Sequence, residues 1–271
     1  MEKREKPLNF CVPQIGEEEI AAAERVLRSG WITTGPECAA FEREFATMVG
    51  AKYGIAVTSA TAGLHILLLG MGIGPGDEVI VPSLTFACDA NMVELVGAKP
   101  VFCDVNPDTM LAEPRNFSSV MTSRTRAAIA VHFAGAPADI DGIRAVLGDI
   151  PLIEDAAHAM GTFYKGAHVG SLGVTAFWSF HPIKNITTVE GGLLTTDDPE
   201  LASALRKARF HGIDKDAWAR YGDRSSPGYD IEAPGFKYNF TDLQAAIGRV
   251  QLTRLAGFNT QIGRASCRER V

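Results

Sequence analysis

The sequence predicts an α/β fold in which helices cover both faces of a largely parallel β-sheet. Short apolar segments with strand character alternate with segments of helical spacing along the chain. The 271 residues are 46% hydrophobic and 21% charged, which supports a sizeable core and excludes a disordered chain. No linker rich in proline or serine divides the chain, so one large domain is expected.

The first expected helix covers Glu17–Ser29, where apolar residues recur at helical spacing, acidic residues open the segment and Gly30 follows it. The same criteria predict further helices over Phe41–Val49, Ala62–Met71, Asp89–Val96, Ile140–Leu147 and Leu201–Arg209, and one that begins near Leu243. Apolar runs of strand length occupy Gly54–Thr58, Glu78–Pro82, Pro100–Asp104, Ala127–His132, Pro151–Glu154 and Thr175–Phe180. Ligands of such sheets bind at the carboxyl ends of the strands, so candidate residues are sought there.

Four alternate glycines, Gly70, Gly72, Gly74 and Gly76, superficially resemble a dinucleotide-binding loop. Such a loop follows a strand and opens a helix, whereas these glycines follow a helix and lead into a strand. We therefore interpret them as a helix stop and a turn.

Charge and cysteine content restrict the class of partner. Twenty-six basic and thirty-two acidic residues give a net charge of −6, which provides no general attraction to nucleic acid or to anionic lipid. The cysteines are odd in number and contain no C-x-x-C pair, which argues against a disulfide framework or a metal site and favours a reducing cytoplasm. The charged N-terminus lacks the apolar run of a signal peptide, and the longest apolar run is too short to cross a membrane.

The segment 58–63, TSATAG, follows a predicted strand and opens a predicted helix. Free backbone N–H groups and the small hydroxyls of Ser59 and Thr61 at a helix N-terminus form an anion site, with Ala60 between them. The alternative interpretation is an ordinary serine or threonine helix cap.

Asp155 ends a predicted buried strand in the segment IEDAAH, and carboxylates are rarely buried without a partner. A protonated heterocyclic nitrogen is one such partner, and a role as helix cap is the alternative. His158 follows three residues later on the same face of a turn, where a purely structural role is also open.

Lys184 follows the aromatic strand in the segment FWSFHPIKN and precedes an apolar, glycine-marked segment. A lysine is usually a solvated surface residue, but one held in such a place has a lowered pKa and becomes an amine nucleophile. A phosphate cup, a carboxylate and a nucleophilic lysine, each at the end of a strand, are together what pyridoxal phosphate requires.

These motifs resemble those of the DegT-type sugar aminotransferases. The resemblance extends from about residue 8 to residue 258 and rests on SGWITTGP, TSATAG, GDEVIVPSLTF, GAKPVFCDVNPDT, VHFAGAPADID, IEDAAHAMGT, SFHPIKNITTVEGG and PGFKYNFTDLQAA. SGWITTGP, SATAG, HFAGAPAD and KNIT are most similar to the UDP-4-amino-4-deoxy-L-arabinose/oxoglutarate aminotransferase branch. The resemblance implies a pyridoxal-phosphate-dependent transferase of fold type I, which is the aspartate-aminotransferase-like fold.

The resemblance also assigns roles. Lys184 matches the lysine of the internal aldimine, Asp155 the acid on the pyridine nitrogen, and His158 a position beside the cofactor ring. Further matches are the ring-stacking Phe86, the phosphate-cup residues Ser59, Ala60, Thr61 and Ser179, the phosphate ligand Asn239 of a partner subunit, and the substrate-loop residues Trp31, Thr33 and Thr34. A homodimer with shared active sites follows from the role of Asn239.

Two departures from the family pattern stand out. Phe86 lies where the arabinose branch tends to have tryptophan, although the aromatic face is kept. Residues 1–250 are expected to form the cofactor domain, and residues 251–271 the start of a connecting helix followed by a basic tail. Because family members continue into a small C-terminal domain of roughly 100 residues, the tail 263–271 is expected to be non-native.

The resemblance implies ping-pong transamination. In the first half-reaction glutamate gives up its amino group and leaves as 2-oxoglutarate, and in the second a nucleotide-linked 4-keto sugar is aminated. UDP is the favoured nucleotide, and the location expected is the cytoplasm. In the related sugar dehydratases, another residue replaces the aldimine lysine. The presence of Lys184 therefore argues against a dehydratase. The remaining alternatives are a non-catalytic sensor or regulator on this fold and an inactive fragment of such an enzyme.

Overall fold

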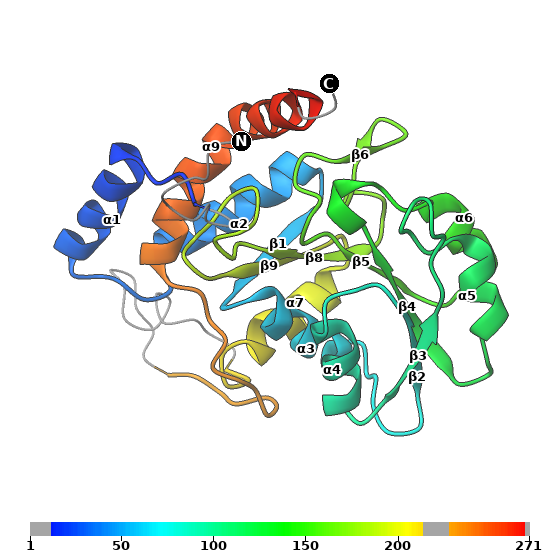
Figure 1. Ribbon diagram of the computed structural model, residues 1–271. Coiled ribbons are helices and arrows are strands. Elements are labelled where there is room, and N and C mark those ends of the chain that lie inside the picture. The colour runs from blue at the N-terminus through cyan, green and yellow to red at the C-terminus, as the bar shows by residue number, and fades with distance from the viewer. Residues whose placement is uncertain (1–11, 214–227, 269–271) are drawn as a thin grey trace, which may run out of the picture.

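The computed structural model describes residues 12–213 and 228–268, and a seven-stranded sheet forms their centre (Figure 1). The strands follow the order β1-β9-β8-β5-β4-β2-β3 across the sheet. Strand β9 runs antiparallel to both of its neighbours, and the other neighbouring pairs are parallel. The strand bounds are β1 Tyr53–Val57, β2 Glu78–Pro82, β3 Lys99–Cys103, β4 Thr125–Val131, β5 Leu152–Asp155, β8 Thr175–Ser179 and β9 Gly192–Thr196, with a separate hairpin of β6 Phe163–Tyr164 and β7 Ala167–His168.

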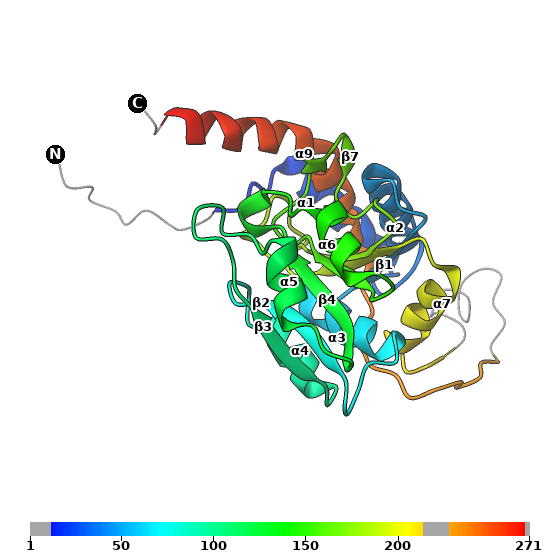
Figure 2. The ribbon, with the colours of Figure 1, turned by 90° about the vertical axis from the view of Figure 1, so that its right-hand side faces the viewer.

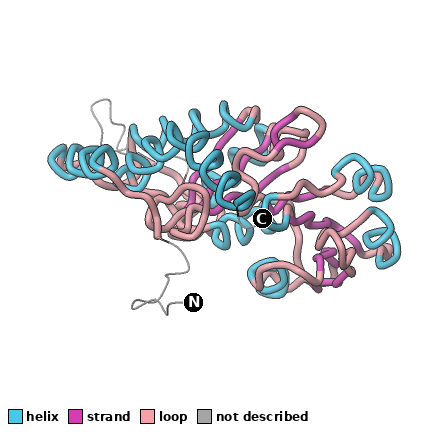
Figure 3. The backbone as a smooth tube through the Cα atoms, turned by 45° about the horizontal axis from the view of Figure 1, so that its top comes forward, coloured by secondary structure: helices cyan, strands magenta, loops and turns pink. Residues whose placement is uncertain are grey.

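Helices pack on both faces of the sheet (Figures 1 and 3). One face is covered by α3 (Ala60–Gly70), α4 (Cys88–Leu95) and α7 (Pro199–Ala208). The other face is covered by α2 (Pro36–Val49) and α9 (Asp242–Arg268) over one half, and by α5 (Pro114–Val120) and α6 (Ile140–Leu147) over the other half. Helix α1 (Glu17–Ser29) packs on α9, whose C-terminal end projects from the body of the molecule (Figure 2).

The strands are apolar on both faces because each face is buried under helices. In β1, Ile55 and Val57 pack toward α3, whereas Ala56 between them packs toward α2. In β8, Phe177 packs on the first face and Trp178 on the second. This arrangement explains why the strand sequences read as continuous apolar runs rather than as alternating ones.

The predicted α/β class and largely parallel sheet are confirmed, and each predicted strand occurs within about two residues of its expected bounds. The expected helix stop and turn at Gly70–Gly76 is also confirmed, with Gly72 and Gly76 at φ angles of 71° and 94°. No helix within residues 12–213 and 228–268 is long and apolar enough to cross a membrane.

The differences lie at the ends of elements and in short ones. Helix α2 begins at Pro36 rather than Phe41, and neither α5 nor the β6–β7 hairpin was expected. Helix α9 continues to Arg268, past Ile262, where the apolar spacing of the sequence stops. An established helix propagates at little cost through residues such as Ala and Arg, which are good helix formers. Residues 269–271 of the expected tail lie outside the described residues.

The strand order determines where a site can form. The carboxyl ends of β1, β2, β4, β5 and β8 lie at one edge of the sheet, because these strands are parallel. Antiparallel β9 begins at that same edge, with Gly192 paired to Val57 and Ser179. Segments that are far apart in the sequence therefore meet there.

Candidate active site

A cavity of about 460 Å³ opens at the carboxyl edge of the sheet. Its walls come from the segments that follow β1, β2, β4, β5 and β8 and precede β9. The lining residues are Ser59, Ala60, Thr61, Thr85, Phe86, Cys88, Val131, Phe133, Asp155, Ala157, His158, Phe177, Ser179, His181, Ile183, Lys184, Glu190 and Gly191. The cavity thus brings together the predicted phosphate cup, the carboxylate and the lysine.

The N-terminus of α3 forms one wall. Ser59 is the N-cap, and its hydroxyl accepts a hydrogen bond from the Ala62 N–H at 3.0 Å. The N–H groups of Ala60 and Thr61 precede the first backbone bond of the helix, from the Gly63 N–H to the Ser59 carbonyl. Two free N–H groups at the positive end of a helix, beside two hydroxyls, favour an anion such as a phosphate.

A glycine allows β9 to approach this wall closely. A Cβ atom at Gly192 would lie 2.3 Å from the backbone N of Ala60 and 2.3 Å from the carbonyl carbon of Ser59. Any other residue would displace either the start of β9 or the anion-binding turn. Gly192 therefore couples the turn to the sheet.

Asp155 ends β5 with its carboxyl at the floor of the cavity and only 6% of its surface exposed. Burial raises its pKa, while the Ala157 N–H, which donates to Oδ1 at 2.9 Å, and the charge of Lys184 act in the opposite direction. A carboxyl in this position is suited to a positively charged N–H partner from a bound group.

Lys184 lies in the loop between β8 and β9, half-buried in the same cavity. Burial lowers the pKa of its ammonium, and the negative charge of Asp155 opposes that shift. The net direction is downward, which increases the fraction of free amine at neutral pH. This is the property required of an amine nucleophile.

His158 and Phe86 are two of the aromatic residues that line the cavity. Burial, and after it the charge of Lys184, lowers the pKa of His158, so the imidazole is neutral at neutral pH. Phe86 follows β2 and is 73% exposed, so its ring is accessible for stacking on a ligand.

The donors in this cavity fit pyridoxal phosphate. Its phosphate matches the free N–H groups at the start of α3, its pyridine nitrogen matches the buried carboxyl of Asp155, and its aldehyde matches the amine of Lys184. Ser179, 8% exposed at the end of β8, adds a hydroxyl to the lining.

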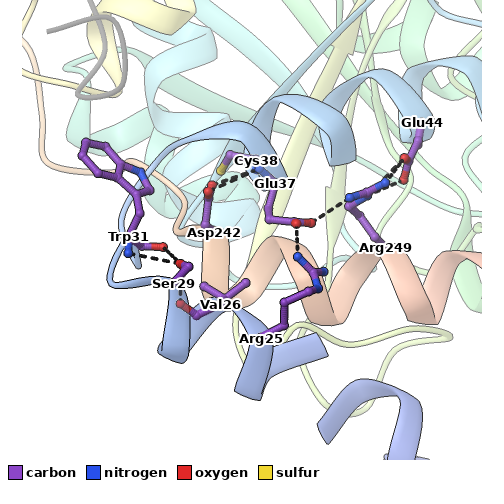
Figure 4. A network of polar contacts seen from close by, with 9 residues as sticks. All are labelled: Arg25, Val26, Ser29, Trp31, Glu37, Cys38, Glu44, Asp242 and Arg249. Atoms are coloured by element: carbon purple, nitrogen blue, oxygen red, sulfur yellow. Dashed lines mark hydrogen bonds and ion pairs between the residues drawn. The ribbon is translucent and has the colours of Figure 1, made fainter. Parts of the chain in front are cut away.

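Four residues of the predicted site lie elsewhere. Asn239 donates from Nδ2 to the Thr34 hydroxyl at 2.8 Å, and both residues are buried outside the Lys184 cavity. The Thr33 carbonyl accepts from the Asp242 N–H at 3.0 Å, and the Trp31 indole donates to the Thr34 carbonyl at 3.2 Å. Figure 4 shows Trp31 beside Ser29 at the end of α1. These residues form one cluster that does not face the lysine of their own chain.

The cavity also contains residues that the motifs did not single out, among them Thr85, Cys88, Phe133, His181 and Glu190. Each follows a predicted strand or precedes β9, so its position after a strand was an available signal. Nothing in the residue types alone separated them from ordinary loop residues.

A larger depression of about 710 Å³ lies at the opposite edge, near the amino ends of β5 and β8. Its lining residues include carboxylates and hydroxyls but no lysine, so it offers no amine nucleophile. Within the described residues, no group of three His, Cys, Asp or Glu side chains is arranged to hold a metal ion.

Comparison with known proteins gives a consistent result. The model of the DegT/DnrJ/EryC1/StrS aminotransferase family matches residues 13–266. One similar solved structure is the PMP form of a Streptococcus pneumoniae protein described as a sugar aminotransferase. Its sequence is 34% identical to this chain, the match covers 93% of this chain and 68% of that one, and the TM-score is 0.85. The PLP form of the same protein is 33% identical, covering 92% and 67%, with a TM-score of 0.84.

An aminotransferase of Psychrobacter cryohalolentis is 40% identical, covering 92% of this chain and 64% of that one, with a TM-score of 0.83. This chain therefore spans about two thirds of the length of the solved structures it matches.

Proposed function

This chain belongs to the DegT/DnrJ/EryC1/StrS aminotransferase family, and from that premise we propose that it is a transaminase that aminates a keto sugar. The family and the PLP-form structure indicate pyridoxal phosphate as the cofactor. The observation that carries the proposal is the meeting of Lys184, Asp155 and the start of α3 in one cavity of about 460 Å³.

Pyridoxal phosphate, when bound, supplies an aldehyde that receives an amino group and a ring that takes up an electron pair. The ammonium of Lys184, with its pKa lowered by burial, provides the free amine that binds the aldehyde carbon. Lys184, as a free amine in this cavity, would be the base and acid that moves a proton between the donor's α-carbon and the cofactor's C4′ carbon.

Other residues of the chain hold and orient the cofactor. Asp155 would keep a proton on the pyridine nitrogen through its buried negative charge, and the exposed Phe86 would stack on the ring. His158 lies beside the ring as a neutral imidazole. Ser59, Ala60, Thr61 and Ser179 bind the phosphate.

We propose a homodimer in which the partner subunit completes each cavity. The position of Asn239 outside the cavity of its own chain supports this arrangement, because its predicted role is to bind the cofactor phosphate. Trp31, Thr33 and Thr34 lie in the same cluster as Asn239, so we assign their substrate contacts to the partner's site as well.

Glutamate is the proposed amino donor, and a nucleotide-linked 4-keto sugar, with UDP as the nucleotide, is the proposed acceptor. Support for this choice comes from the segments SGWITTGP, SATAG, HFAGAPAD and KNIT, which resemble the arabinose branch. The proposed location is the cytoplasm, which fits the cysteine content and the net charge of −6.

The proposal is tested by adding pyridoxal phosphate to the purified chain, recording its visible absorbance and reducing the complex with borohydride. Wild type and the matched control Lys52→Ala, at an exposed lysine, should bind and retain the cofactor covalently, whereas Lys184→Ala should lose both signals. A Lys184→Ala variant that still retains reduced cofactor would exclude Lys184 as the attachment site.

Glutamate should then convert the bound cofactor to its aminated form, and a panel of nucleotide-linked keto sugars should reverse the change. A chain that binds the cofactor but shows no conversion with glutamate would favour the sensor interpretation over transamination.

A further inference from the structure

Asp89 is a buried carboxyl behind the cavity wall that the proposed function does not use. It is the second residue of α4 and has no exposed surface. None of the ion pairs within residues 12–213 and 228–268 includes it. A fully buried carboxyl without a cation is costly, so its retention requires an explanation.

The carboxyl and the backbone N–H of Asp89 form hydrogen bonds with the wall segment 85–88. The Thr85 hydroxyl donates to Oδ2 at 2.5 Å, the Cys88 thiol donates to Oδ1 at 3.4 Å, and the Asp89 N–H donates to the Phe86 carbonyl at 3.1 Å. Thr85, Phe86 and Cys88 line the cavity, whereas Asp89 does not. Asp89 therefore fixes the backbone and side chains of the turn that presents the Phe86 ring.

Asp155 is the charged group that acts on Asp89 across the cavity floor. Burial and the negative charge of Asp155 raise the pKa of Asp89 to about 8, and the hydrogen bonds from Thr85 and Cys88 only partly oppose this shift. Helix α4 also packs against α3, β2 and β3, but the titratable groups that bear on the Asp89 carboxyl are Asp155 and Cys88. Two adjacent buried carboxyls do not both ionise at neutral pH, so one of them keeps a proton.

The surroundings decide which carboxyl stays neutral. Asp155 faces Lys184 and receives the Ala157 N–H, both of which favour its ionised form. Behind it, His132 acts on Asp155 in the same direction, with its Nδ1 accepting from the Ala138 N–H at 3.1 Å and its Nε2 2.8 Å from Glu154. Among the residues that the structure describes, no cation and no backbone N–H contacts the Asp89 carboxyl, so the proton stays on Asp89.

We propose that Asp89 is a positioning residue of the cofactor cavity, which holds the wall segment 85–88 and keeps the negative charge of the cavity floor on Asp155. The inference rests on the proposed function, because Asp155 needs that charge to pair with the cofactor's pyridine nitrogen. Asp89 itself touches neither cofactor nor substrate.

Infrared difference spectroscopy of the full chain without added cofactor tests the proton directly. A carbonyl band of a protonated carboxylic acid should disappear as the pH rises through about 8. The band should be present in wild type and in Glu94→Gln, an exposed acid on the same helix, and missing from Asp89→Asn. An unchanged band in Asp89→Asn would overturn the inference that Asp89 holds the proton.

Binding of pyridoxal phosphate tests the positioning role. Asp89→Asn keeps an oxygen that can accept from Thr85 and should bind the cofactor within about threefold of wild type at neutral pH. Asp89→Ala loses both side-chain contacts and should bind about tenfold more weakly, with a changed spectrum of the bound cofactor. Wild-type affinity and spectrum in Asp89→Ala would overturn the positioning role.

If Asp89→Ala does not fold, the infrared result for Asp89→Asn still decides whether Asp89 holds the proton. Failure of wild type to bind pyridoxal phosphate would overturn the proposed function, and that outcome is distinct from normal wild-type binding with unaltered Asp89 variants.

Discussion

Asp242, the first residue of α9, accepts a hydrogen bond on Oδ1 from the Cys38 N–H at 2.9 Å, and on Oδ2 from the Glu37 N–H at 3.3 Å (Figure 4). The first turn of α2 is therefore capped by a residue about 200 positions away rather than by its own N-cap, Gly35. In the same region Arg249 of α9 bridges Glu37 and Glu44 of α2. The two helices are joined by polar contacts as well as by apolar packing.

Removing this cap should destabilise the chain. Asp242→Ala should lower the free energy of unfolding by about 1–2 kcal/mol, because one buried and one partly buried N–H group of α2 lose their acceptor. Urea unfolding measures the change as a lower midpoint with the same slope. Asp242→Asn keeps an acceptor and should lose less, and the exposed control Asp149→Ala should change little. Equal stability of Asp242→Ala and wild type would contradict a capping role.

Gly192→Ala should weaken cofactor binding more than it weakens the fold. The added Cβ atom would lie 2.3 Å from the Ala60 backbone N, so the anion-binding turn must shift. A loss of about tenfold or more in affinity for pyridoxal phosphate is expected. The control Gly257→Ala meets nothing within 4 Å in α9 and should stabilise the chain by about 0.5–1 kcal/mol through helix propensity. Unchanged affinity in Gly192→Ala would show that the turn does not bind the phosphate.

Asp155→Asn should lower the pKa of Lys184 further, since the negative charge of Asp155 raises it. The rate at which pyridoxal labels Lys184, followed by borohydride reduction and peptide mass spectrometry, should rise with pH with a midpoint at lower pH than in wild type. Asp104→Asn, at an exposed position, serves as the control and should keep the wild-type midpoint. A midpoint that stays or rises in Asp155→Asn argues against charge coupling between the two residues.

Glu19 gives the chain an acid-sensitive contact between α1 and α9. Burial by itself raises its pKa, but hydrogen bonds from the Gly16 N–H, Gln251 and Arg254 outweigh burial and lower it below 4.5. A lowered pKa in the folded state contributes stability above pH 4.5 that is lost as the pH falls through the folded-state value.

Near pH 7, Glu19→Gln should therefore have a free energy of unfolding about 1–2 kcal/mol lower than that of wild type. Between about pH 5 and pH 3, the variant should lose less of its remaining stability than wild type does. Urea titrations of both proteins at about pH 7, pH 5 and pH 3 measure these differences in stability. If both proteins lose the same amount on acidification, Glu19 is not the group responsible.

The proposed dimer makes a complementation prediction. Lys184→Ala and Asn239→Ala should each bind pyridoxal phosphate poorly, the first for lack of the amine and the second for lack of the partner's amide. An equal mixture, unfolded and refolded together, should recover up to about a quarter of wild-type sites, because half of the chains form mixed dimers with one intact site each. A mixture that binds no better than either variant would exclude sites shared in this way.

Much of the fold followed from local patterns. The strand segments, most helices and the helix stop at Gly70–Gly76 are each determined by apolar periodicity, glycine and capping residues within a short stretch of chain. The start of α2 was five residues off: Pro36 in its first turn was a local signal that was not used, and its cap, Asp242, is not revealed by any local pattern. Helix α5 and the β6–β7 hairpin are too short to show a period.

The same distinction applies to the candidate site. Lys184, Asp155 and Ser59–Thr61 stood out because residue type and position after a strand agree with one chemistry. Thr85, Cys88 and His181 did not, because their residue types have many uses and only the cavity groups them. Asp89 had no signal in its residue type, since an acid near a helix start is ordinary until its burial beside Asp155 is known.

The sequence by itself determined the α/β class and the order of its elements, and it predicted the residues suited to bind pyridoxal phosphate, since these depend on side-chain chemistry and short-range periodicity. Tertiary structure alone decided that β9 runs antiparallel, that Gly192 lies against Ala60, and that Asn239 joins Thr34 away from Lys184. Those relationships depend on which strands pair and which helices cap one another across long sequence separations. Burial then sets the charge of Lys184, Asp155 and Asp89, because desolvation and neighbouring charges exist only once the chain has folded.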